Sequence, residues 1–560
     1  GIVRRTSLES YRTAEPEWET VLDVDALAKA ENENWVYKGI DWLAPGYERC
    51  LVKLSRGGTD ASVHREFDTL AKRFVEGGFE LPEAKSDVAW LDRDTLLVGT
   101  NWGEGTLTES GYPRVAKRWK RGTPLAKAET IFEGRHEDIS ISPRVMDSGE
   151  EMLAMIAQSL TFYTGAYHLI GGDGKLQRLP LPESVDLAGF YSGRILFTLR
   201  DAWEVAGRTF PQGALLAIDV AAVRATGELP RIETIYTPDD RTSIEGVTVS
   251  RSGLYVSLLQ NVKGRILRFG VDAKSGEWSA EPLPLPDNGT VSLSAANPHS
   301  ETVLVNYEDH ITPDRLSEYD AGANALTLLK SLPARFRADD LQVSQHIARS
   351  ADGEAVPYFV IHRKGLKLDG STPTILYGYG GFEISLKPSY SATIGKLWLE
   401  RGGAYAVANI RGGGEFGPRW HKAALKTNRQ RAYDDFIAVA EDLAKRGITS
   451  PKRLGISGGS NGGLLVGAIF TQRPDLMNAV VCRVPLLDML RYTKLLAGAS
   501  WAAEYGDPED SVMRAAILKY SPYQNIFPGR KYPKVFIETS TKDDRVHPGH
   551  ARKMVARMRE

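Results

Sequence analysis

Short runs of alternating apolar and polar residues, separated by turn residues, fill the chain from residue 1 to about residue 335. In the run TGAYHLIGGDGKLQRLPLP, around Tyr167, this pattern predicts a strand, a turn at GGDG and a second strand. A second hairpin is predicted for GLYVSLLQNVKGRILRFGVD, turning at residues 261–264, and a third for ETVLVNYEDH followed by ALTLL. RILFTLR and GALLAIDV predict two further strands. Few segments have the 3.6-residue period of a long helix, so this part is predicted to be all-β.

Many short strands over so long a stretch predict a β-propeller with blades of ~40–50 residues. Radial repetition of small antiparallel sheets favours this fold, because it leaves only short, protected strand edges. A pair of stacked β-sandwiches has the same local pattern. The internal repeat is too faint to separate the two architectures, and both stay open at this point.

From about residue 336 the pattern changes to short apolar strands that alternate with helices. The predicted strands are TPTILYGYGG, AYAVANIRGGG, RLGISGGS, NAVVCRVP and KVFIETS. The clearest helix is RQRAYDDFIAVAEDLAKRG, in which Phe436, Ile437, Ala440 and Leu443 share one face and Gly447 is the expected stop. Such alternation predicts a mostly parallel sheet with helices on both faces, with chemistry at the carboxyl ends of its strands. We therefore expect two domains, residues 1–335 and 336–560.

Composition narrows the class of protein. The chain has 560 residues, which is too long for one ordinary core, and its 42% apolar and 25% charged residues are typical of soluble globular proteins. The net charge of −1 gives no basic excess for nucleic-acid binding, and no apolar run is long enough to span a membrane. No HExxH motif or Cys/His cluster is present, so neither a metal nor a cofactor is expected.

The two cysteines and the N-terminus bear on the compartment. Cys50 and Cys482 lie far apart in the chain and imply no disulfide framework, which fits a reducing compartment. GIVRRTSLESYR lacks the apolar core of a signal peptide and has no starting methionine, so the N-terminus is expected to be incomplete. We expect a cytoplasmic protein, with a periplasmic or secreted location as the alternative.

The stretch RLGISGGSNGGLLVGAIF carries the strongest chemical signal. Residues 458–462 fit G-x-S-x-G between a strand and an apolar helix, the context in which a sharp turn exposes a nucleophilic serine, here Ser460. A phosphate-binding loop would need a G-K-[ST] ending, which is absent. The N–H of Asn461, the next residue, is then a predicted oxyanion donor. In an α/β-hydrolase the acid follows the serine, and Asp543 and Asp544, just after the strand KVFIETS, both qualify.

Five stretches of the second half together resemble the peptidase domain of the prolyl oligopeptidase family of serine peptidases. They are LYGYGGFEIS, ANIRGGGEFGPRWHK, GISGGSNGGLL, ASWAAEYGDP and TKDDRVHPGH, in the family's order. The β-rich half resembles that family's seven-bladed propeller by architecture more than by motif. The resemblance implies an α/β-hydrolase peptidase domain with an N-terminal propeller that admits short peptides and excludes folded proteins.

The resemblance also implies roles for individual residues. Ser460 would be the nucleophile and Asp543 the triad acid, with the hydroxyl of Tyr379 as the second oxyanion donor beside the Asn461 amide. Arg545 would bind a substrate carbonyl. Trp501 would stack on a substrate proline ring, a rigid apolar group that suits a flat aromatic face. The remaining lining of that pocket would be Phe382, Tyr505 and Val546. A branch that cleaves after Arg or Lys needs carboxylates instead, and Glu504 leaves that alternative open.

The triad histidine is the missing piece. His421 precedes the serine, which is the wrong order for this fold. His547 and His550 follow Asp543 but lie in its own loop and at the start of HARKMVARMRE, a predicted helix whose apolar face is Ala551, Met554, Val555 and Met558. The family's histidine follows a further helix and strand. We therefore expect it beyond Glu560, and expect the chain as given to be inactive by itself.

Taken together, these patterns predict a monomeric serine endopeptidase that cleaves short proline-containing peptides through an acyl-enzyme, with neither nucleic-acid nor membrane partners. Two alternatives stay open. One is an oligopeptidase of the same superfamily with a different preference for the residue before the cleaved bond. The other is a non-catalytic binding protein built from a propeller and a hydrolase-like domain.

Overall fold

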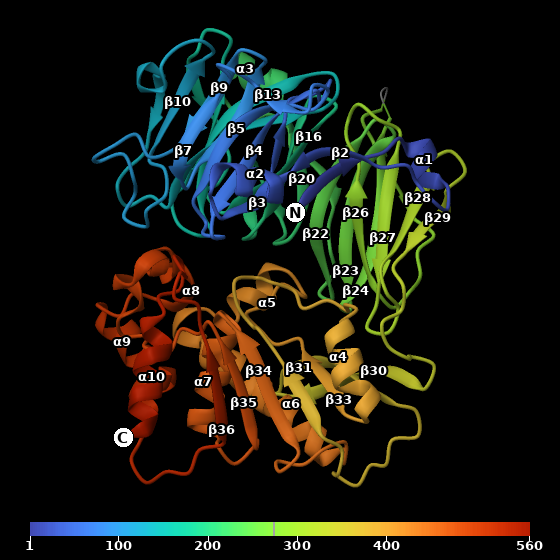
Figure 1. The fold of residues 1–560 in the computed structure, drawn as a ribbon, viewed down its shortest axis with the longest axis vertical. Coiled ribbons are helices and arrows are strands. Elements are labelled where there is room, and N and C mark those ends of the chain that lie inside the picture. The colour runs from blue at the N-terminus through green and yellow to red at the C-terminus, as the bar shows by residue number, and fades with distance from the viewer. Residues whose placement is uncertain (273–274) are drawn as a thin grey trace. The chain divides into compact units, whose positions relative to one another are not determined.

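The structure is a computed structural model, which describes residues 1–272 and 275–560 (Figure 1). Its contacts divide the chain into two compact units. One consists of Gly1–Phe197 and Ala217–Glu233, and the other of Thr198–Leu216 and Thr234–Glu560. Among the described residues, no helix has both the length and the apolar character that a membrane crossing requires.

The first part of the chain consists of antiparallel sheets made of consecutive strands. Three of them are β3 (Trp35–Trp42), β4 (Arg49–Arg56), β5 (Ser62–Asp68), β6 (Arg73–Phe74) and β7 (Glu80–Ala84); β8 (Asp87–Asp92), β9 (Thr95–Gly99), β10 (Val115–Lys120) and β11 (Glu129–Glu133); and β12 (Ser140–Asp147), β13 (Met152–Ser159), β14 (Gly165–Ile170) and β15 (Leu176–Arg178). Near the N-terminus lie the ribbon β1 (Ile2–Arg5) and β2 (Glu19–Asp23) and the helices α1 (Leu8–Arg12) and α2 (Val24–Glu31). The predicted hairpin around Tyr167 is confirmed as β14 and β15.

Three more sheets follow in the same style. They are β16 (Val185–Tyr191), β17 (Arg194–Leu199), β20 (Leu215–Asp219) and β21 (Glu233–Tyr236); β22 (Thr242–Ser250), β23 (Gly253–Gln260), β24 (Lys263–Val271) and β25 (Trp278–Pro282); and β26 (Thr290–Ala295), β27 (Val303–Glu308), β28 (Arg315–Asp320) and β29 (Ala325–Ser331). The first also carries the ribbon β18 (Trp203–Val205) and β19 (Arg208–Phe210) and the helix α3 (Val220–Thr226). Consecutive sheets of this kind are the blades that the alternating pattern predicts. The number of seven blades stays a prediction.

One of the predicted hairpins is wrong. Strand β27 does not pair with β29, because β28 lies between them and pairs with both. The segment RLSEYD of β28 contains only two apolar residues, Leu316 and Tyr319, so its alternation was too weak to predict a strand. The hairpin of β23 and β24 is confirmed, and its turn at Asn261 and Val262 has φ values of 49° and 64°. Both central residues of a type I′ turn have positive φ, the conformation that suits a tight hairpin.

A seven-stranded sheet organises the second half of the chain, in the order β30-β31-β33-β32-β34-β35-β36. Its strands are β30 (Leu341–Arg349), β31 (Ala355–Arg363), β32 (Thr374–Tyr377), β33 (Ala404–Ala408), β34 (Leu454–Gly459), β35 (Ala479–Arg483) and β36 (Lys534–Glu538). The five predicted strands are β32 to β36, and they run parallel. Strands β30 and β31 are antiparallel additions at one edge.

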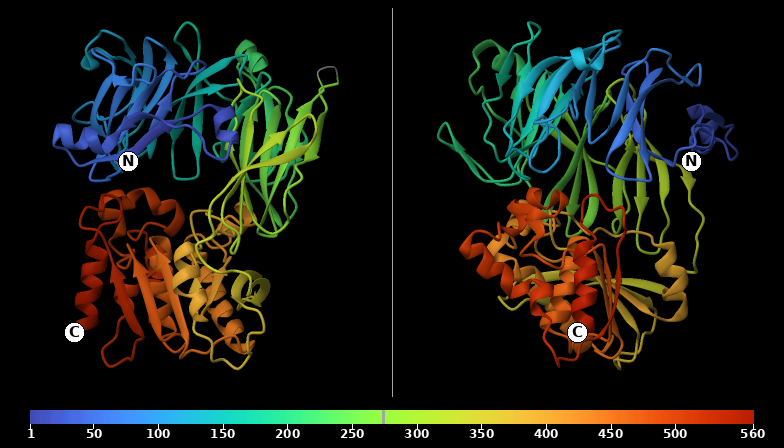
Figure 2. Two further views of the ribbon diagram at one scale, coloured as in Figure 1. Left: turned by 45° about the vertical axis from the view of Figure 1, so that its right-hand side comes forward. Right: turned by 60° about the vertical axis from the view of Figure 1, so that its left-hand side comes forward.

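Helices alternate with the parallel strands of this half, as can be followed from yellow to red in Figure 2. They are α4 (Ala392–Leu397), α5 (Pro418–Lys422), α6 (Gln430–Lys445), α7 (Asn461–Gln472), α8 (Ala502–Tyr505), α9 (Ser511–Tyr520) and α10 (Gly549–Arg559). The predicted helix in HARKMVARMRE is confirmed as α10, in which Ala551 and Met554 are buried. Helix α6 confirms the other predicted helix. It ends at Lys445, and Gly447 follows two residues later with a φ of 71°.

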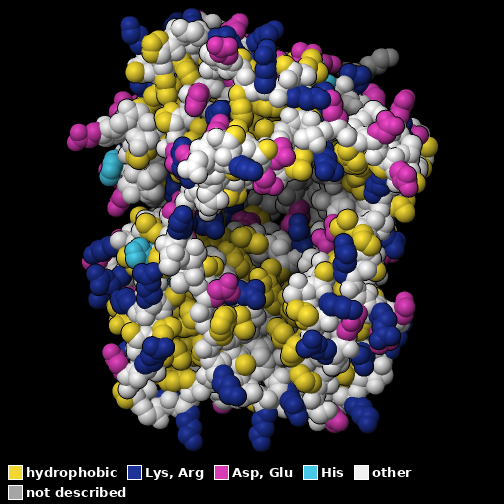
Figure 3. All heavy atoms as spheres, in the orientation of Figure 1, with side chains coloured by type: hydrophobic (Ala, Val, Ile, Leu, Met, Phe, Trp, Pro, Cys, Tyr) yellow, Lys and Arg dark blue, Asp and Glu magenta, His cyan; other side chains and the backbone are white. Residues whose placement is uncertain are grey.

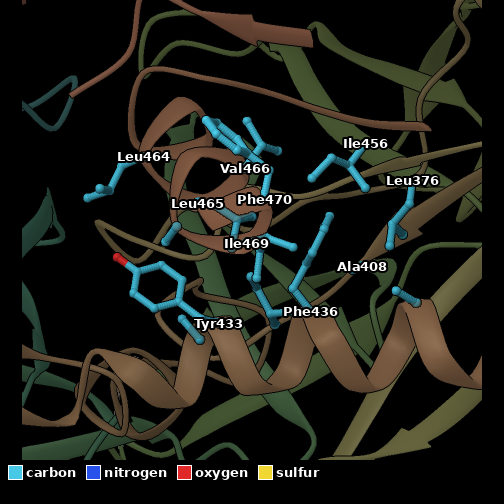
Figure 4. Packing of buried hydrophobic residues seen from close by; sticks show 14 of the residues in the cluster. Leu376, Ala408, Tyr433, Phe436, Ile456, Leu464, Leu465, Val466, Ile469 and Phe470 are labelled. Carbon is cyan, nitrogen blue, oxygen red and sulfur yellow. The ribbon is translucent and has the colours of Figure 1, made fainter. Parts of the chain in front are cut away.

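The two faces of the sheet differ, because successive side chains of a strand point to opposite sides. On one face Leu376 and Ile456 are buried in a single cluster with residues of α6 and α7 (Figure 4). On the other face Ile375 and Tyr405 line a groove of about 610 Å³ beside α4. Figure 3 shows hydrophobic side chains gathered in a hollow in this half of the molecule. One face thus carries the main core, and the other is only partly covered.

A substitution at Phe436 tests the packing of the core between α6 and the sheet. Its ring is fully buried between α6 and the sheet, and a Cβ on Gly378 would lie 2.7 Å from it. We expect Phe436→Ala to lower the free energy of unfolding by about 3–5 kcal/mol, because the cavity cannot close around the lost ring. Urea unfolding followed by circular dichroism measures the change. Lys445→Ala on the exposed side of α6 is the control, with an expected change within about 0.5 kcal/mol. Equal losses in the two variants would contradict the assignment of this core.

Candidate active site

Three of the predicted site residues lie at one edge of the parallel sheet. Tyr379 follows β32, Ser460 follows β34 and Asp543 follows β36. These strands run in the same direction with β34 and β36 separated only by β35, so their carboxyl ends meet at the same edge. This is the edge at which open parallel sheets bind ligands.

The turn at Ser460 has the strained geometry that the motif predicts. Its φ of 56° and ψ of −119° lie outside the regions that non-glycine residues favour, between the last residue of β34 and the first of α7. The Ser460 N–H donates to the carbonyl of Arg483 at 2.9 Å. A Cβ on Gly458 would lie 2.2 Å from the carbonyl oxygen of Gly462, and one on Gly462 would lie 2.8 Å from that of Gly378. Only glycine fits at these two positions.

Asn461 stands at the start of α7, where the N–H has no acceptor within the helix. Its buried side chain is held on several sides. The amide nitrogen Nδ2 donates to the carbonyl of Tyr379 at 2.6 Å, while Oδ1 accepts from Arg429 Nη2 at 2.6 Å and from the Tyr505 hydroxyl at 2.8 Å. These contacts tie the residue after the serine to the loop that carries Tyr379.

The phenol of Tyr379 is suited to donate a hydrogen bond. Burial raises its pKa above the ordinary value, and a side-chain hydrogen bond with Ser460 acts in the opposite direction. The hydroxyl is therefore protonated at neutral pH and lies beside the serine. A neutral phenol and a helix N-terminal amide are both groups that stabilise an oxyanion.

The loop after β36 holds Asp543 by its own backbone. Oδ1 of Asp543 accepts from the N–H groups of Arg545 at 3.1 Å and Val546 at 2.8 Å, a local turn that orients the carboxylate. Arg545 is exposed, and its charge acts on the Tyr379 phenol. The loop therefore lies on the same side of the domain as Tyr379. Asp544 is half-buried beside it.

The predicted apolar pocket residues belong to the same core region. Trp501, Tyr505 and Val546 are buried in the main cluster of this half, and Phe382 packs against that cluster. The rings of Phe382 and Tyr505 meet edge to face, with centroids 5.7 Å apart. Tyr505 is completely buried, so the structure gives it contacts with Asn461 and Phe382 as part of the supporting wall.

Glu504 is fully buried, and both of its oxygens are engaged. Oε1 accepts from the Phe382 N–H at 3.0 Å and from Arg429 Nη1 at 2.7 Å, and Oε2 is 2.8 Å from His421 Nε2. From the sequence, His421 is a candidate only for the triad base, and Arg429 carries no functional signal. The stretch ANIRGGGEFGPRWHK, which contains His421, carries part of the family resemblance, but no local pattern indicates where the imidazole ring lies. No short-range signal distinguishes Arg429 from a surface arginine.

The two late histidines are held by the backbone. Nδ1 of His550 accepts from the N–H groups of Leu487 at 3.3 Å and Asp488 at 3.1 Å, and Nδ1 of His547 accepts from the Gly549 N–H at 2.9 Å. His550 is buried, and burial lowers its pKa to about 4. These bonds anchor the start of α10. Among the described residues, no group of three His, Cys, Asp or Glu side chains is placed to hold a metal ion.

Comparisons with known proteins agree with this architecture. The model of the N-terminal beta-propeller domain of prolyl oligopeptidase matches residues 1–332, and that of the prolyl oligopeptidase family matches residues 388–560. The two matches support a β-propeller followed by an α/β-hydrolase domain. The boundary near residue 335 stays a prediction.

Individual relatives cover most or part of the chain. An uncharacterized peptidase of Sinorhizobium fredii is 48% identical over 568 residues, which cover 99% of the chain and 77% of that protein. A prolyl endopeptidase of Elizabethkingia miricola is 38% identical over 345 residues, which cover 61% of the chain and 48% of that protein. The solved structure of a post-proline cleaving enzyme from Rickettsia typhi has a TM-score of 0.95 at 34% identity, and the match covers 100% of the chain and 82% of that structure.

The glycines of the turn give a direct test of its geometry. We expect Gly458→Ala to destabilise the protein by about 1–3 kcal/mol, because its methyl group would clash with the backbone of α7. Gly455→Ala is the matched control on the same strand, since the nearest atom to its methyl would be 3.7 Å away. Thermal unfolding of both variants measures the difference. A Gly458→Ala protein as stable as the control would contradict the close backbone approach.

The buried ring of His550 predicts a dependence of stability on pH. Its pKa is about 4 in the fold and about 6.5 in an unfolded chain, so the unfolded state binds the extra proton between these values. The contribution of neutral His550 to the free energy of unfolding is fully present above about pH 6.5. It is lost as the pH falls toward 4, by on the order of 3 kcal/mol. His550→Asn keeps an acceptor for the two amides and removes the titration, so its urea unfolding should lose that part of the pH dependence. The same replacement at exposed His136 is the control. Identical pH profiles for His550→Asn and the wild type would refute the assignment.

Proposed function

Because the chain belongs to the prolyl oligopeptidase family of serine peptidases, we propose that it is an endopeptidase that cleaves short peptides on the carboxyl side of proline. The observation that carries this proposal is the strained Ser460 beside the Tyr379 phenol and the free helix end at Asn461. A serine in this position can attack a carbonyl while two donors face the developing negative charge.

The chemistry follows from these positions. The Ser460 oxygen forms a bond with the carbonyl carbon of the proline residue and gives its proton to a histidine base. The Tyr379 hydroxyl and the Asn461 N–H stabilise the oxyanion of the tetrahedral intermediate. The C–N bond then breaks, and the leaving amine takes the proton from the histidine. Water next attacks the acyl-enzyme and gives a proton to the histidine, which passes it to the Ser460 oxygen as the ester bond breaks. Asp543 orients the histidine.

His547 and His550 are unsuited to be that base, because Nδ1 of each ring already accepts hydrogen bonding from the backbone. A triad histidine instead needs Nδ1–H for the acid and Nε2 for the serine. We therefore propose that the 560-residue chain is inactive by itself and that another histidine completes the site.

Specificity for proline is supported by the state of Glu504. A substrate arginine or lysine needs a carboxylate with a free oxygen, and both Glu504 oxygens are already bound within the fold. Phe382, which is partly buried and packs against the cluster that contains Trp501 and Val546, instead gives this region an apolar character that suits a pyrrolidine ring. The solved neighbour from Rickettsia typhi is a post-proline cleaving enzyme, which supports the same preference. We further propose that the protein acts as a cytoplasmic monomer.

Paired substrates test the specificity. Chromogenic peptides that differ only in proline or arginine before the cleaved bond should differ in kcat/KM by about 100-fold or more in favour of proline. Burial of the arginine charge without a partner costs several kcal/mol. The assay uses the protein as its gene encodes it, with Ser460→Ala as the blank. Faster turnover of the arginine peptide would overturn the proposed preference.

The nucleophile has a separate test that also addresses the non-catalytic alternative. A fluorophosphonate probe should label Ser460 in the protein as its gene encodes it, and labelling should disappear in Ser460→Ala. The 560-residue chain alone should react little or not at all, because its serine lacks a base. Absence of labelling in the protein as its gene encodes it would defeat the enzyme proposal. Full activity of the 560-residue chain would instead show that His547 or His550 serves as the base.

A further inference from the structure

The loop that carries Tyr379 is strained and needs support. Phe382 and Glu383 are consecutive non-glycine residues with φ values of 56° and 57°. Backbone conformations of this kind cost on the order of 1–3 kcal/mol each and persist only where the surroundings enforce them. The supports are contacts with distant parts of the chain. The Phe382 N–H donates to Glu504, the Glu383 N–H donates to the carbonyl of Gly412 at 3.1 Å, and the Glu383 carboxylate is 2.5 Å from Arg200.

Arg429 joins this loop to the nucleophile turn. Its guanidinium is buried, and one nitrogen, Nη2, donates both to the carbonyl of Gly380 at 2.7 Å and to Asn461 Oδ1 at 2.6 Å. The other terminal nitrogen, Nη1, donates to Glu504 at 2.7 Å. One rigid fork therefore contacts the residue after Tyr379, the residue after Ser460 and the carboxylate that holds Phe382. A planar guanidinium suits this task, whereas an ammonium is a point charge.

His421 and Arg200 complete the charged group around Glu504. Arg200 Nη2 is 3.3 Å from His421 Nδ1, which assigns that nitrogen as the acceptor and Nε2 as the donor to Glu504. Glu504, Arg429 and His421 are all buried, so their interactions are strong and are costly to leave incomplete. These buried polar contacts hold the Tyr379 loop in one geometry, which its two strained residues would not keep without them.

We propose that Arg429, held by Glu504 and His421, is a positioning residue that keeps the two oxyanion donors, the Tyr379 hydroxyl and the Asn461 amide, at their working separation. It contacts neither substrate nor reacting atoms. It acts through the carbonyl of Gly380 and the side chain of Asn461. The part of this inference that concerns turnover rests on the proposed peptidase function. The part that concerns the order of the loop does not.

Arg429→Lys is the variant that tests it, because it keeps the positive charge opposite Glu504 and removes the fork. We expect amide hydrogen exchange in residues 376–385 to become faster, since the loop loses its bond at Gly380. We also expect kcat for a proline peptide to fall by about tenfold or more with KM nearly unchanged. Oxyanion stabilisation is realised in the transition state and not in substrate binding. Both measurements use the protein as its gene encodes it.

Arg473→Lys is the control. Arg473 caps the C-terminal end of α7, whereas Asn461 stands at the N-terminal end of this helix. Arg473 makes ion pairs with Asp475 and Glu441, as Arg429 does with Glu504, but lies away from the strained loop. Amide hydrogen exchange in residues 376–385 and kcat of the Arg473→Lys variant should equal those of the wild type. Unchanged exchange in that segment of Arg429→Lys overturns the inference, whether or not the wild type cleaves peptides. Unchanged kcat with an active wild type overturns it as well. A wild type without activity refutes the proposed function alone, and the exchange result then decides the inference.

Discussion

The close approach of two backbone segments at the turn between β34 and α7 is the constraint on which the site depends. The Cα of Gly458 faces the carbonyl of Gly462, and Gly462 in turn faces the carbonyl of Gly378. With no side chains between them, the strand end, the helix start and the Tyr379 loop are brought into direct contact. The strained conformation of Ser460 follows from this geometry, as does the position of the Asn461 amide at the helix end.

The protonation state of the Tyr379 phenol and the strength of the Glu504–Arg429 ion pair both depend on the exclusion of water. Burial keeps the Tyr379 phenol protonated, and the same burial makes Glu504 and Arg429 dependent on each other. A pair of this kind adds little to stability when compared with apolar residues of the same size, but it is costly to break. Its value here is geometric, since each member also binds a backbone group of the Tyr379 loop.

Local features of the fold could be predicted from the sequence, and distant ones could not. The turn at Ser460, the parallel strands β32 to β36 and the helix α6 each carry a pattern within ten to twenty residues, and each is confirmed. Strand β28 was missed because its residues are mostly polar. The contacts of Arg429 with Gly380, Asn461 and Glu504 join positions that are 32 to 75 residues apart. No period or short motif encodes such contacts, so they emerge only when the sheet order is known.

The backbone at Ser460 has one more consequence, which concerns what selection must maintain. At a φ of 56°, glycine is the residue that costs least, and any L side chain lowers stability there. A chain that used this domain only as a binding surface would become more stable by exchanging the serine for glycine. Serine at this position is therefore held against a stability gradient, as expected where strain and activity are traded against each other. The side chain that this backbone conformation disfavours is the one that the proposed chemistry requires.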